Sequence, residues 1–385
     1  MADGTAGPLS DLRILDVSTL IPGPYATQML ADLGASVIAV EPPRGEPGRQ
    51  MGADLHDVSH RNKRSICLDL KTDAGLRHCL DLASTADVLV EGFRPGVADR
   101  LGVGYHAVAA RNPAIIYCSI SGYGQEGPSS HFPGHDLNYL LASGFLSFPG
   151  TWQDRRGRRP GVPVADLGAS AFATVAILAA LHERSATGRG ARLDAALTDA
   201  ATALAAVRAG ARLDIEGAAK AHLIPTNDIF ETSDGSIGIG AVEDHFWQAL
   251  RDVLAGFDDR IADVRFDTAA GRHEHGDELS CLVSSLLATR PTPYWSEVFA
   301  ANDVPFAVLR GISEAVDDPQ TKARGIVQEL DGQRHVTFPV VKDGRPMGRL
   351  TRVAPAAGAD TGTVLEALDA GHDPWATEWK KAADE

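Results

Sequence analysis

Short apolar runs rich in β-branched residues alternate with helix-like segments through the first third of the chain. The strand-like runs occupy residues 12–18, 36–41, 65–70, 87–93 and 114–120. Residues 23–35 and 75–86 lie between them and place apolar side chains at helical spacing. Regular alternation of strands with helices predicts an α/β fold built on a parallel sheet.

The pattern changes after this region. Residues 136–184 read as mostly helical, and the alanine-rich segment 191–211 predicts a further helix. Two short strand runs then meet at Asp234-Gly235, a typical hairpin turn. Strand-like runs return over 334–342 and 348–355. We therefore predict four parts: a large domain over 1–195 that 330–385 completes, a linker over 196–226, a small α+β domain over 227–311, and a linker over 312–329.

Composition narrows the class of protein. The chain has 385 residues, of which 44% are hydrophobic and 23% charged, as in ordinary globular proteins. A net charge of −15 argues against a nucleic-acid partner. Four scattered cysteines without a C-x-x-C pair predict reduced thiols and no zinc site. The N-terminus does not resemble a secretion signal, and the longest apolar run, 171–181, is too short to span a membrane. We expect a cytoplasmic protein without a membrane partner.

Basic residues gather in one stretch and at one strand end. They are Arg61, Lys63, Arg64, Lys71 and Arg94. In open α/β sheets ligands bind beyond the carboxyl ends of strands, so these cations could hold a phosphorylated ligand. A solvated charged face explains such a run equally well. The Arg-rich loop 153–161 is expected to face solvent.

Several familiar motifs are missing from the sequence. The turn after the first strand reads "STLIPGPYA", without the G-x-G-x-x-G of a dinucleotide site. Neither a Walker A motif nor G-x-S-x-G occurs. His273 and His275 are two residues apart, which is not helical ligand spacing, so we predict no metal site.

Acidic and basic groups stand where helices are predicted to begin. His135 and Asp136 precede one apolar helix, Asp166 a second, and Glu243 a third. A carboxylate at a helix start is most often a cap. The same position can present a catalytic group to a cleft, where backbone N–H groups also stabilise an oxyanion. The residues alone leave both readings open.

Longer stretches resemble the family III CoA transferases. They are "LRILDVSTLIPGPYATQMLADLGASVIAVEPP", "RNKRSICLDLK", "ADVLVEGFRPGVADRLG", "SGYGQEGP", "GHDLNYLLASG" and "ILAALHERSATGRGARLDAALTDA". The resemblance implies an interlocked homodimer whose chains each have a Rossmann-like large domain and a smaller domain. It implies an acyl-CoA as substrate and no further cofactor. The basic cluster named above would then contact the phosphates of CoA.

Two chemistries occur among the proteins that this sequence resembles. In the transferases an aspartate, matched by Asp166, forms an acyl anhydride and then an aspartyl-CoA thioester. The α-methylacyl-CoA racemases are more similar here, since "GHD-N-Y" matches His135 to Tyr139 and a glutamate matches Glu243. We therefore favour inversion of a 2-methyl-branched acyl-CoA, with CoA transfer as the alternative. A CoA-binding protein without catalysis would not need all three groups.

The racemase reading assigns a role to each residue. His135 would take the proton next to the thioester, because imidazole titrates near neutral pH. Asp166 would supply a proton on the opposite face, provided that burial raises its pKa. Glu243 would orient His135. N–H groups at the helix start near Asp166 are expected to stabilise the enolate. Asp136 is expected to be a cap or a supporting partner.

Overall fold

The computed structural model describes residues 7–148, 150–152, 158–209 and 223–376. These residues form two compact units. Residues 1–143, 161–204 and 316–385 make the first unit and residues 144–160 and 205–315 the second, each over its described part. Residues 153–157 of the Arg-rich loop and 210–222 of the first predicted linker lie outside the described residues.

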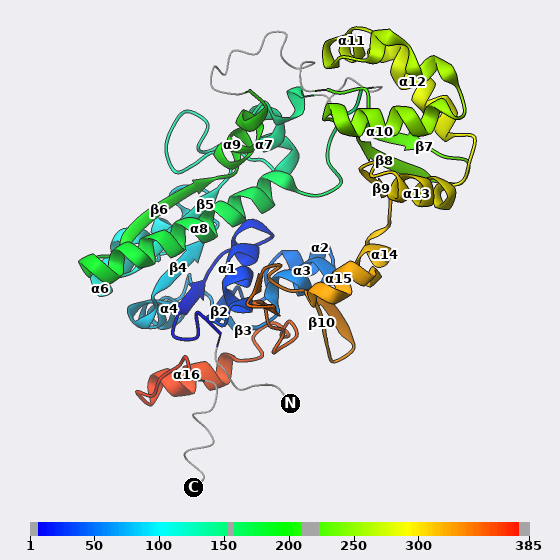
Figure 1. Ribbon diagram of the computed structural model, residues 1–385. Helices are drawn as coiled ribbons and strands as arrows, with labels where there is room; N and C mark the ends of the chain where they lie inside the picture. The colour runs from blue at the N-terminus through cyan, green and yellow to red at the C-terminus, as the bar shows by residue number, and fades with distance from the viewer. Residues whose placement is uncertain (1–6, 149, 153–157, 210–222, 377–385) are drawn as a thin grey trace. The chain divides into compact units, whose positions relative to one another are not determined.

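Six parallel strands form the sheet of the first unit, in the order β3-β2-β1-β4-β5-β6 (Figure 1). Their bounds are β1 Arg13–Asp16, β2 Ser36–Glu41, β3 Lys63–Cys67, β4 Val88–Glu91, β5 Ile116–Ser121 and β6 Ala191–Ala196. The parallel α/β sheet predicted from the sequence is confirmed. The strands that follow β1 are added first on one side of it, as β2 and β3, and then on the other, as β4, β5 and β6. Such a reversal of the strand order leaves a crevice at the carboxyl ends of the strands.

Helices cover both faces of this sheet. They are α1 Pro22–Asp32, α2 Gly48–Met51, α3 Ala53–His60, α4 Asp73–Thr85, α5 Val97–Arg100, α6 Tyr105–Arg111, α7 Asp136–Ala142, α8 Val164–Thr187, α9 Leu197–Ala209 and α16 Thr361–Asp369. Leu15 and Leu89 belong to a core shared with α4, α6 and α16. Their neighbours Ile14 and Val88 are equally buried and point to the opposite face, which α1 and α8 cover.

The alanine-rich segment begins with a strand, so the helix predicted over 191–211 is wrong for its first turns. β6 pairs with β5 along its whole length, from Ala191 to Ala196. Arg192 and Asp194 are exposed and alternate with partly buried Leu193 and Ala195, the period of a strand. Pairing with the sheet edge outweighs the helix propensity of alanine, and α9 begins only at Leu197.

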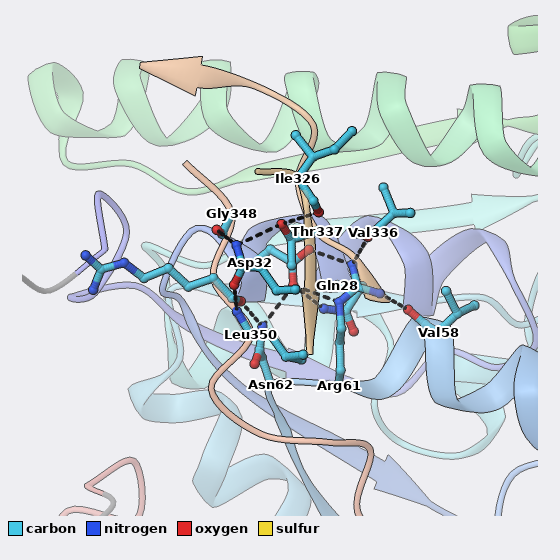
Figure 2. Close-up of polar contacts among 12 residues, drawn as sticks. Gln28, Asp32, Val58, Arg61, Asn62, Ile326, Val336, Thr337, Gly348 and Leu350 are labelled. Atoms are coloured by element: carbon cyan, nitrogen blue, oxygen red, sulfur yellow. Dashed lines mark hydrogen bonds and ion pairs between the residues drawn. The ribbon is translucent and has the colours of Figure 1, made fainter. Parts of the chain in front are cut away.

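The C-terminal segment returns to the first unit around a buried aspartate (Figure 2). Its elements are α15 Pro319–Arg324, β10 Val327–Leu330, β11 Gln333–Val336, β12 Val341–Lys342 and β13 Arg345–Pro346. Arg61 and Asn62 donate to the Asp32 carboxylate. Asn62 Oδ1 accepts from the Thr351 N–H at 2.8 Å, and the Arg349 N–H donates to the Asp32 carbonyl at 3.0 Å. The strand predicted over 348–355 is wrong. The backbone of this segment forms hydrogen bonds with Asn62 and Asp32 in place of a neighbouring strand.

An antiparallel sheet, β7-β8-β9, forms the second unit together with helices that include α10 to α13. The bounds are β7 Asn227–Glu231, β8 Ser236–Gly240, β9 Phe306–Val308, α10 Asp244–Ala255, α11 Ala269–Glu274, α12 Gly276–Leu287 and α13 Thr292–Ala301. Trp247 and Trp295 lie fully buried in its core. The β7–β8 pairing confirms the hairpin predicted at Asp234-Gly235. The predicted linkers contain helices: α9 in the first, and α14 Ile312–Asp317 with α15 in the second.

One helix of the described chain, α8, is long and apolar enough to cross a membrane, judged by length and composition alone. The core helices of soluble proteins pass the same test. In this fold α8 packs against α1, β5 and β6.

Candidate active site

A cavity of about 530 Å³ opens at the carboxyl edge of the six-stranded sheet. Its wall includes residues 19–23, which lead from β1 into α1, residues 92–95 after β4, and residues 120–122 at the end of β5 and just beyond it. His135, Asp166 and Arg94, three of the residues predicted from the sequence, line this one cavity. Glu243 lies in the second unit, exposed at the N-cap of α10, and its side chain makes no capping bond.

Asp166 stands in the first turn of α8, as the sequence predicts, and its neighbour Asp136 caps that helix. Asp136 Oδ1 accepts hydrogen bonds from the Ala165 N–H at 2.7 Å and the Asp166 N–H at 3.4 Å. Asp136 is therefore the expected cap, but of α8 and not of its own helix α7. The Leu167 N–H donates to the Pro163 carbonyl at 3.0 Å. These three N–H groups already have acceptors, which argues against their use in stabilising an enolate.

The electrostatics around Asp166 favour its protonated form. Burial raises the pKa of Asp166 to about 7, and the negative charge of Asp136 adds to this shift. Within the described residues no ion pair joins Asp166 to a cation. Burial, followed by the charge of Asp166, also raises the pKa of Tyr139 to about 12. A carboxyl poised near neutrality on a cavity wall is typical of a catalytic group.

Tyr139 closes one side of the cavity beside Asp166. Its ring lies so close to Gly122 and Gly134 that a Cβ atom on either would come within 2.5 Å and 2.8 Å of the ring, respectively. The ring also packs edge-on against Tyr123, with the two centroids 5.3 Å apart. The two glycines thus hold space for an aromatic wall next to the carboxylate.

His135 is the N-cap residue of α7 and its side chain is exposed. The backbone N–H of His135 donates to Asn138 Oδ1 at 3.0 Å, which fixes the start of the helix. The imidazole lines the same cavity as Asp166, so both groups that the sequence selected can reach one ligand.

Three of the predicted CoA-binding cations have partners inside the protein. Arg61 Nη2 lies 2.6 Å from Asp32 Oδ2, and Lys63 Nζ lies 3.0 Å from Asp16 Oδ2. Lys63 is fully buried, and burial lowers its pKa against the attraction of Asp16. Arg64 donates to backbone carbonyls of the C-terminal segment, including that of Pro374 at 2.8 Å. These contacts give all three a structural role.

The other two predicted cations are exposed to solvent. Lys71 follows β3, and Arg94 follows β4 and lines the cavity. Among the five cations predicted to bind CoA, Arg94 is therefore the one whose position in the cavity supports contact with a ligand that also reaches Asp166.

Comparison with known proteins identifies the family. The model of CoA-transferase family III matches residues 9–361. The chain belongs to CoA-transferase family III. Relatives of this family III enzyme include the acetyl-CoA:oxalate CoA-transferase of Acetobacter aceti, 34% identical over 85% of this chain and 87% of that protein. The succinyl-CoA:glutarate CoA-transferase of Mus musculus is 32% identical over 93% of this chain and 86% of that protein.

A solved structure shares the fold of the family III chain. The CAIB/BAIF family protein from Brucella suis superposes with a TM-score of 0.84 and 27% identity, over 95% of this chain and 100% of that chain. The resemblance predicted from the sequence motifs is confirmed, and so is the assignment to a family of enzymes that act on CoA thioesters.

Two features of the family III site escape sequence reasoning. Leu20 lines the cavity with a φ of 68°, in the left-handed region that non-glycine residues rarely adopt. Glu46 Oε2 accepts its N–H at 3.2 Å. Tyr139 reads as one more apolar position of α7. The sequence signals for these two features are weak. They are a turn, "STLIPGPYA", with no glycine at position 20, and the two glycines that contact the ring, Gly122 and Gly134.

Proposed function

We propose that this family III enzyme transfers CoA between carboxylic acids, with Asp166 as the nucleophile. The position of Asp166 supports the proposal most strongly: it is partly buried on the cavity wall, it has no ion pair with a cation of the described residues, and its pKa is about 7. At neutral pH a large fraction is ionised, and this carboxylate is more basic than an ordinary one. A basic, poorly solvated carboxylate is suited to attack a thioester. The names of the relatives, which are CoA transferases, support the same reaction.

The proposed reaction has two symmetrical halves. A carboxylate oxygen of Asp166 attacks the thioester carbonyl carbon, the C–S bond breaks, and CoA leaves as the thiolate; the acyl group and Asp166 are then joined as a mixed anhydride. The thiolate then attacks the Asp166 carbonyl carbon and releases the first acid as its carboxylate. The acceptor carboxylate repeats these steps in reverse on the aspartyl-CoA thioester. The products are the new acyl-CoA and free Asp166.

Arg94 and His135 support this chemistry in the proposal. Arg94, exposed beside the loop after β4, suits a phosphate of CoA while the thioester reaches Asp166. His135 faces the same cavity and can donate a hydrogen bond to the thioester carbonyl or to the acceptor carboxylate. CoA is a substrate here, and we propose no resident cofactor for the transfer.

Racemisation is the second candidate, favoured by one observation. His135 and Asp166 line one cavity, and the raised pKa of Asp166 leaves part of it protonated, as the proton donor of a racemase requires. The substrate would be a 2-methyl-branched acyl-CoA. We rank this reading second because Asp136 and Pro163 occupy the N–H groups that an enolate would need.

One screen separates the two reactions. Acetyl-CoA and succinyl-CoA are each offered with a panel of small mono- and dicarboxylic acids, and 2-methyl-branched acyl-CoA esters are incubated in heavy water. The proposal expects a new acyl-CoA with at least one acid, and an adduct on Asp166 that hydroxylamine traps. The opposite result would be deuterium at the α-carbon without an acceptor acid and no CoA transfer to any acid of the panel. It would contradict the transferase proposal and support racemisation.

We further propose that two copies of the chain assemble as a homodimer. Phe172 and Val175 on α8 are 47% and 64% exposed, and their three-residue spacing puts them on one face of the helix. The strand order β3-β2-β1-β4-β5-β6 supports a Rossmann-like description of the first unit. Light scattering at micromolar concentration tests the assembly, and a monomer would contradict it. The cytoplasmic location stays a prediction from the sequence.

A further inference from the structure

Three buried ligand-type side chains meet behind the loop that follows β1. They are Glu46, His56 and His60, each 2% exposed. One ligand atom of each lies within 4.8 Å of the other two. His56 and His60 are one turn apart on α3, and their rings stack with centroids 3.8 Å apart. None of the three lines the Asp166 cavity.

Two atoms of this cluster lack partners. Glu46 Oε1 and His56 Nε2 are buried, and neither forms a hydrogen bond in the part of the chain that the structure describes. The other oxygen, Glu46 Oε2, accepts the Leu20 N–H at 3.2 Å and no second donor from the described residues. Unpartnered buried polar atoms are costly, and buried carboxylates are normally paired with a cation or bound to a metal. The two unpartnered atoms therefore favour binding of a positively charged ligand.

Two cations close to Glu46, Arg49 and Lys63, form their ion pairs with other carboxylates. Arg49 donates to both carboxylate oxygens of Glu41, at 2.7 Å and 2.6 Å. Lys63 pairs with Asp16 at 3.0 Å. Over the described residues, Glu46 has no ion pair of its own. Arg49 and Lys63 attract the Glu46 charge from a distance, but among the described residues neither forms an ion pair with it.

Hydrogen bonds already orient the two imidazoles as metal ligands. His60 Nδ1 lies 3.0 Å from the His56 carbonyl, which acts as the acceptor for an Nδ1–H. This contact leaves the lone pair on Nε2. His56 Nδ1 faces Asp57 Oδ1 at 3.5 Å, so its Nε2 is likewise the free nitrogen. Metal-bound histidines commonly donate the other ring N–H to a carbonyl or a carboxylate.

We propose that Glu46, His56 and His60 form a binding site for a divalent transition-metal ion, with zinc as the best match. Two imidazole nitrogens and a carboxylate oxygen are a ligand set that zinc accepts, with a fourth position for water. Bonds of about 2.0–2.2 Å would separate the ligand atoms by roughly 3.3–3.6 Å in a tetrahedral site. The present separations of up to 4.8 Å would close by small side-chain rotations.

The site would act on the structure of the cavity and not on the transfer chemistry. Glu46 Oε2 holds the N–H of Leu20, whose strained backbone lines the Asp166 cavity. A metal on Glu46 Oε1 would fix the carboxylate between α3 and this loop. The prediction of no metal site considers His273 and His275 alone and misses this site. His56 and His60 have the four-residue spacing of ligands on one helix face, but Glu46 lies ten positions before His56.

The test uses the full-length protein after chelator treatment and dialysis. Zinc is titrated in competition with a chromophoric chelator, and cobalt(II) is added separately to record its visible d–d bands. We expect one ion per chain and the cobalt spectrum of a low-symmetry site with nitrogen ligands. Glu46→Gln and His56→Gln should each weaken zinc binding at least about tenfold, the minimum effect of losing even a supporting partner.

The control removes two other imidazoles. His273→Gln with His275→Gln, in the second unit, should leave zinc affinity unchanged. If His56→Gln does not fold, the zinc affinity of Glu46→Gln and the cobalt spectrum of the wild type still test the proposed metal site. The proposal is overturned if the wild type binds neither ion in stoichiometric amount, if Glu46→Gln binds zinc as tightly as the wild type, or if the control variant loses the ion.

Discussion

Asp16 at the end of β1 and Asp166 at the start of α8 are two aspartates of the same unit in opposite surroundings. Asp16 is 1% exposed and receives Lys63 Nζ at 3.0 Å and Thr27 Oγ1 at 2.6 Å. Asp166 is also partly buried, yet its charged neighbour is Asp136, another acid. One carboxylate is neutralised by its surroundings, and the other is held near a second negative charge.

The difference separates a structural carboxylate from a reactive one. The Asp16–Lys63 pair joins β1, α1 and β3 and has no access to the cavity. Asp166 costs the fold free energy when it ionises, because neither a cation nor bulk water fully compensates its charge. A protein retains such a cost where the group has a task, as active-site residues do.

The largest effect is expected from Asp166→Asn. The amide cannot form the anhydride, so CoA transfer should fall at least about a thousandfold, as for the loss of other catalytic nucleophiles. The matched control is Asp199→Asn, an exposed aspartate in the first turn of α9, which should transfer at the wild-type rate. Steady-state transfer assays on both variants check this. Near-normal CoA transfer by Asp166→Asn would show that Asp166 is not the nucleophile.

Lys63→Met tests the other side of the comparison. It leaves the Asp16 charge buried and unpaired, so the free energy of unfolding should drop by about 3–5 kcal/mol. Adding Asp16→Asn should recover part of this loss, because the uncompensated charge is then gone. Urea unfolding of the single and double variants measures the coupling. A stability equal to that of the wild type would mean that the pair contributes nothing.

The pH dependence of stability sharpens the contrast. The pKa of Asp166 is about 7 in the folded protein and about 3.9 in the unfolded chain. Between these values the folded state binds more protons, so the stabilisation present at low pH is lost as pH rises through 7. Asp166→Asn should thus be more stable than the wild type by up to about 4 kcal/mol at pH 8, at about 1.4 kcal/mol for each pKa unit, and about equal at pH 4. Thermal unfolding at both values checks this, and no gain at pH 8 would contradict it.

The smallest effect is expected from Asp136→Asn. Its amide oxygen can still accept the Ala165 N–H, but the negative charge beside Asp166 is lost. The pKa of Asp166 should fall, and the rise of kcat/KM with pH should move to a lower pH. Because the amide can still cap α8, the free energy of unfolding should change by less than about 1 kcal/mol. A pH profile identical to that of the wild type would show that the Asp136 charge does not act on Asp166.

Local sequence patterns predict the sheet and the helix starts, because both depend on neighbours along the chain. The placement of His135 and Asp166 at the beginnings of α7 and α8 follows from the apolar runs after them. The structural roles of Arg61, Lys63 and Arg64 cannot be predicted in this way. Their partners, which are Asp32, Asp16 and Pro374 in that order, lie far away in sequence. A basic run looks the same whether its side chains meet a ligand or a buried acid.

The same limit explains the other differences. Residues 191–196 have the composition of a helix, and only the free edge of β5 makes them a strand. Asp136 has the position of a cap for α7, yet its acceptor oxygen serves α8, a helix that begins 28 residues later. Contacts between distant segments decide both outcomes.

The central claim is that Asp166 is the nucleophile, and it implies that the Asp166 carboxylate exchanges an oxygen atom with the carboxylic acid substrates. In the proposed reaction the oxygen with which the acceptor attacks the aspartyl-CoA thioester stays on Asp166 when the new thioester forms. Turnover with an acceptor acid labelled with ¹⁸O in its carboxylate should therefore place the heavy isotope in the Asp166 side chain. Tandem mass spectrometry of the peptide that contains Asp166 would show it, with Asp199 unlabelled. Transfer of CoA that leaves Asp166 without ¹⁸O would contradict the account.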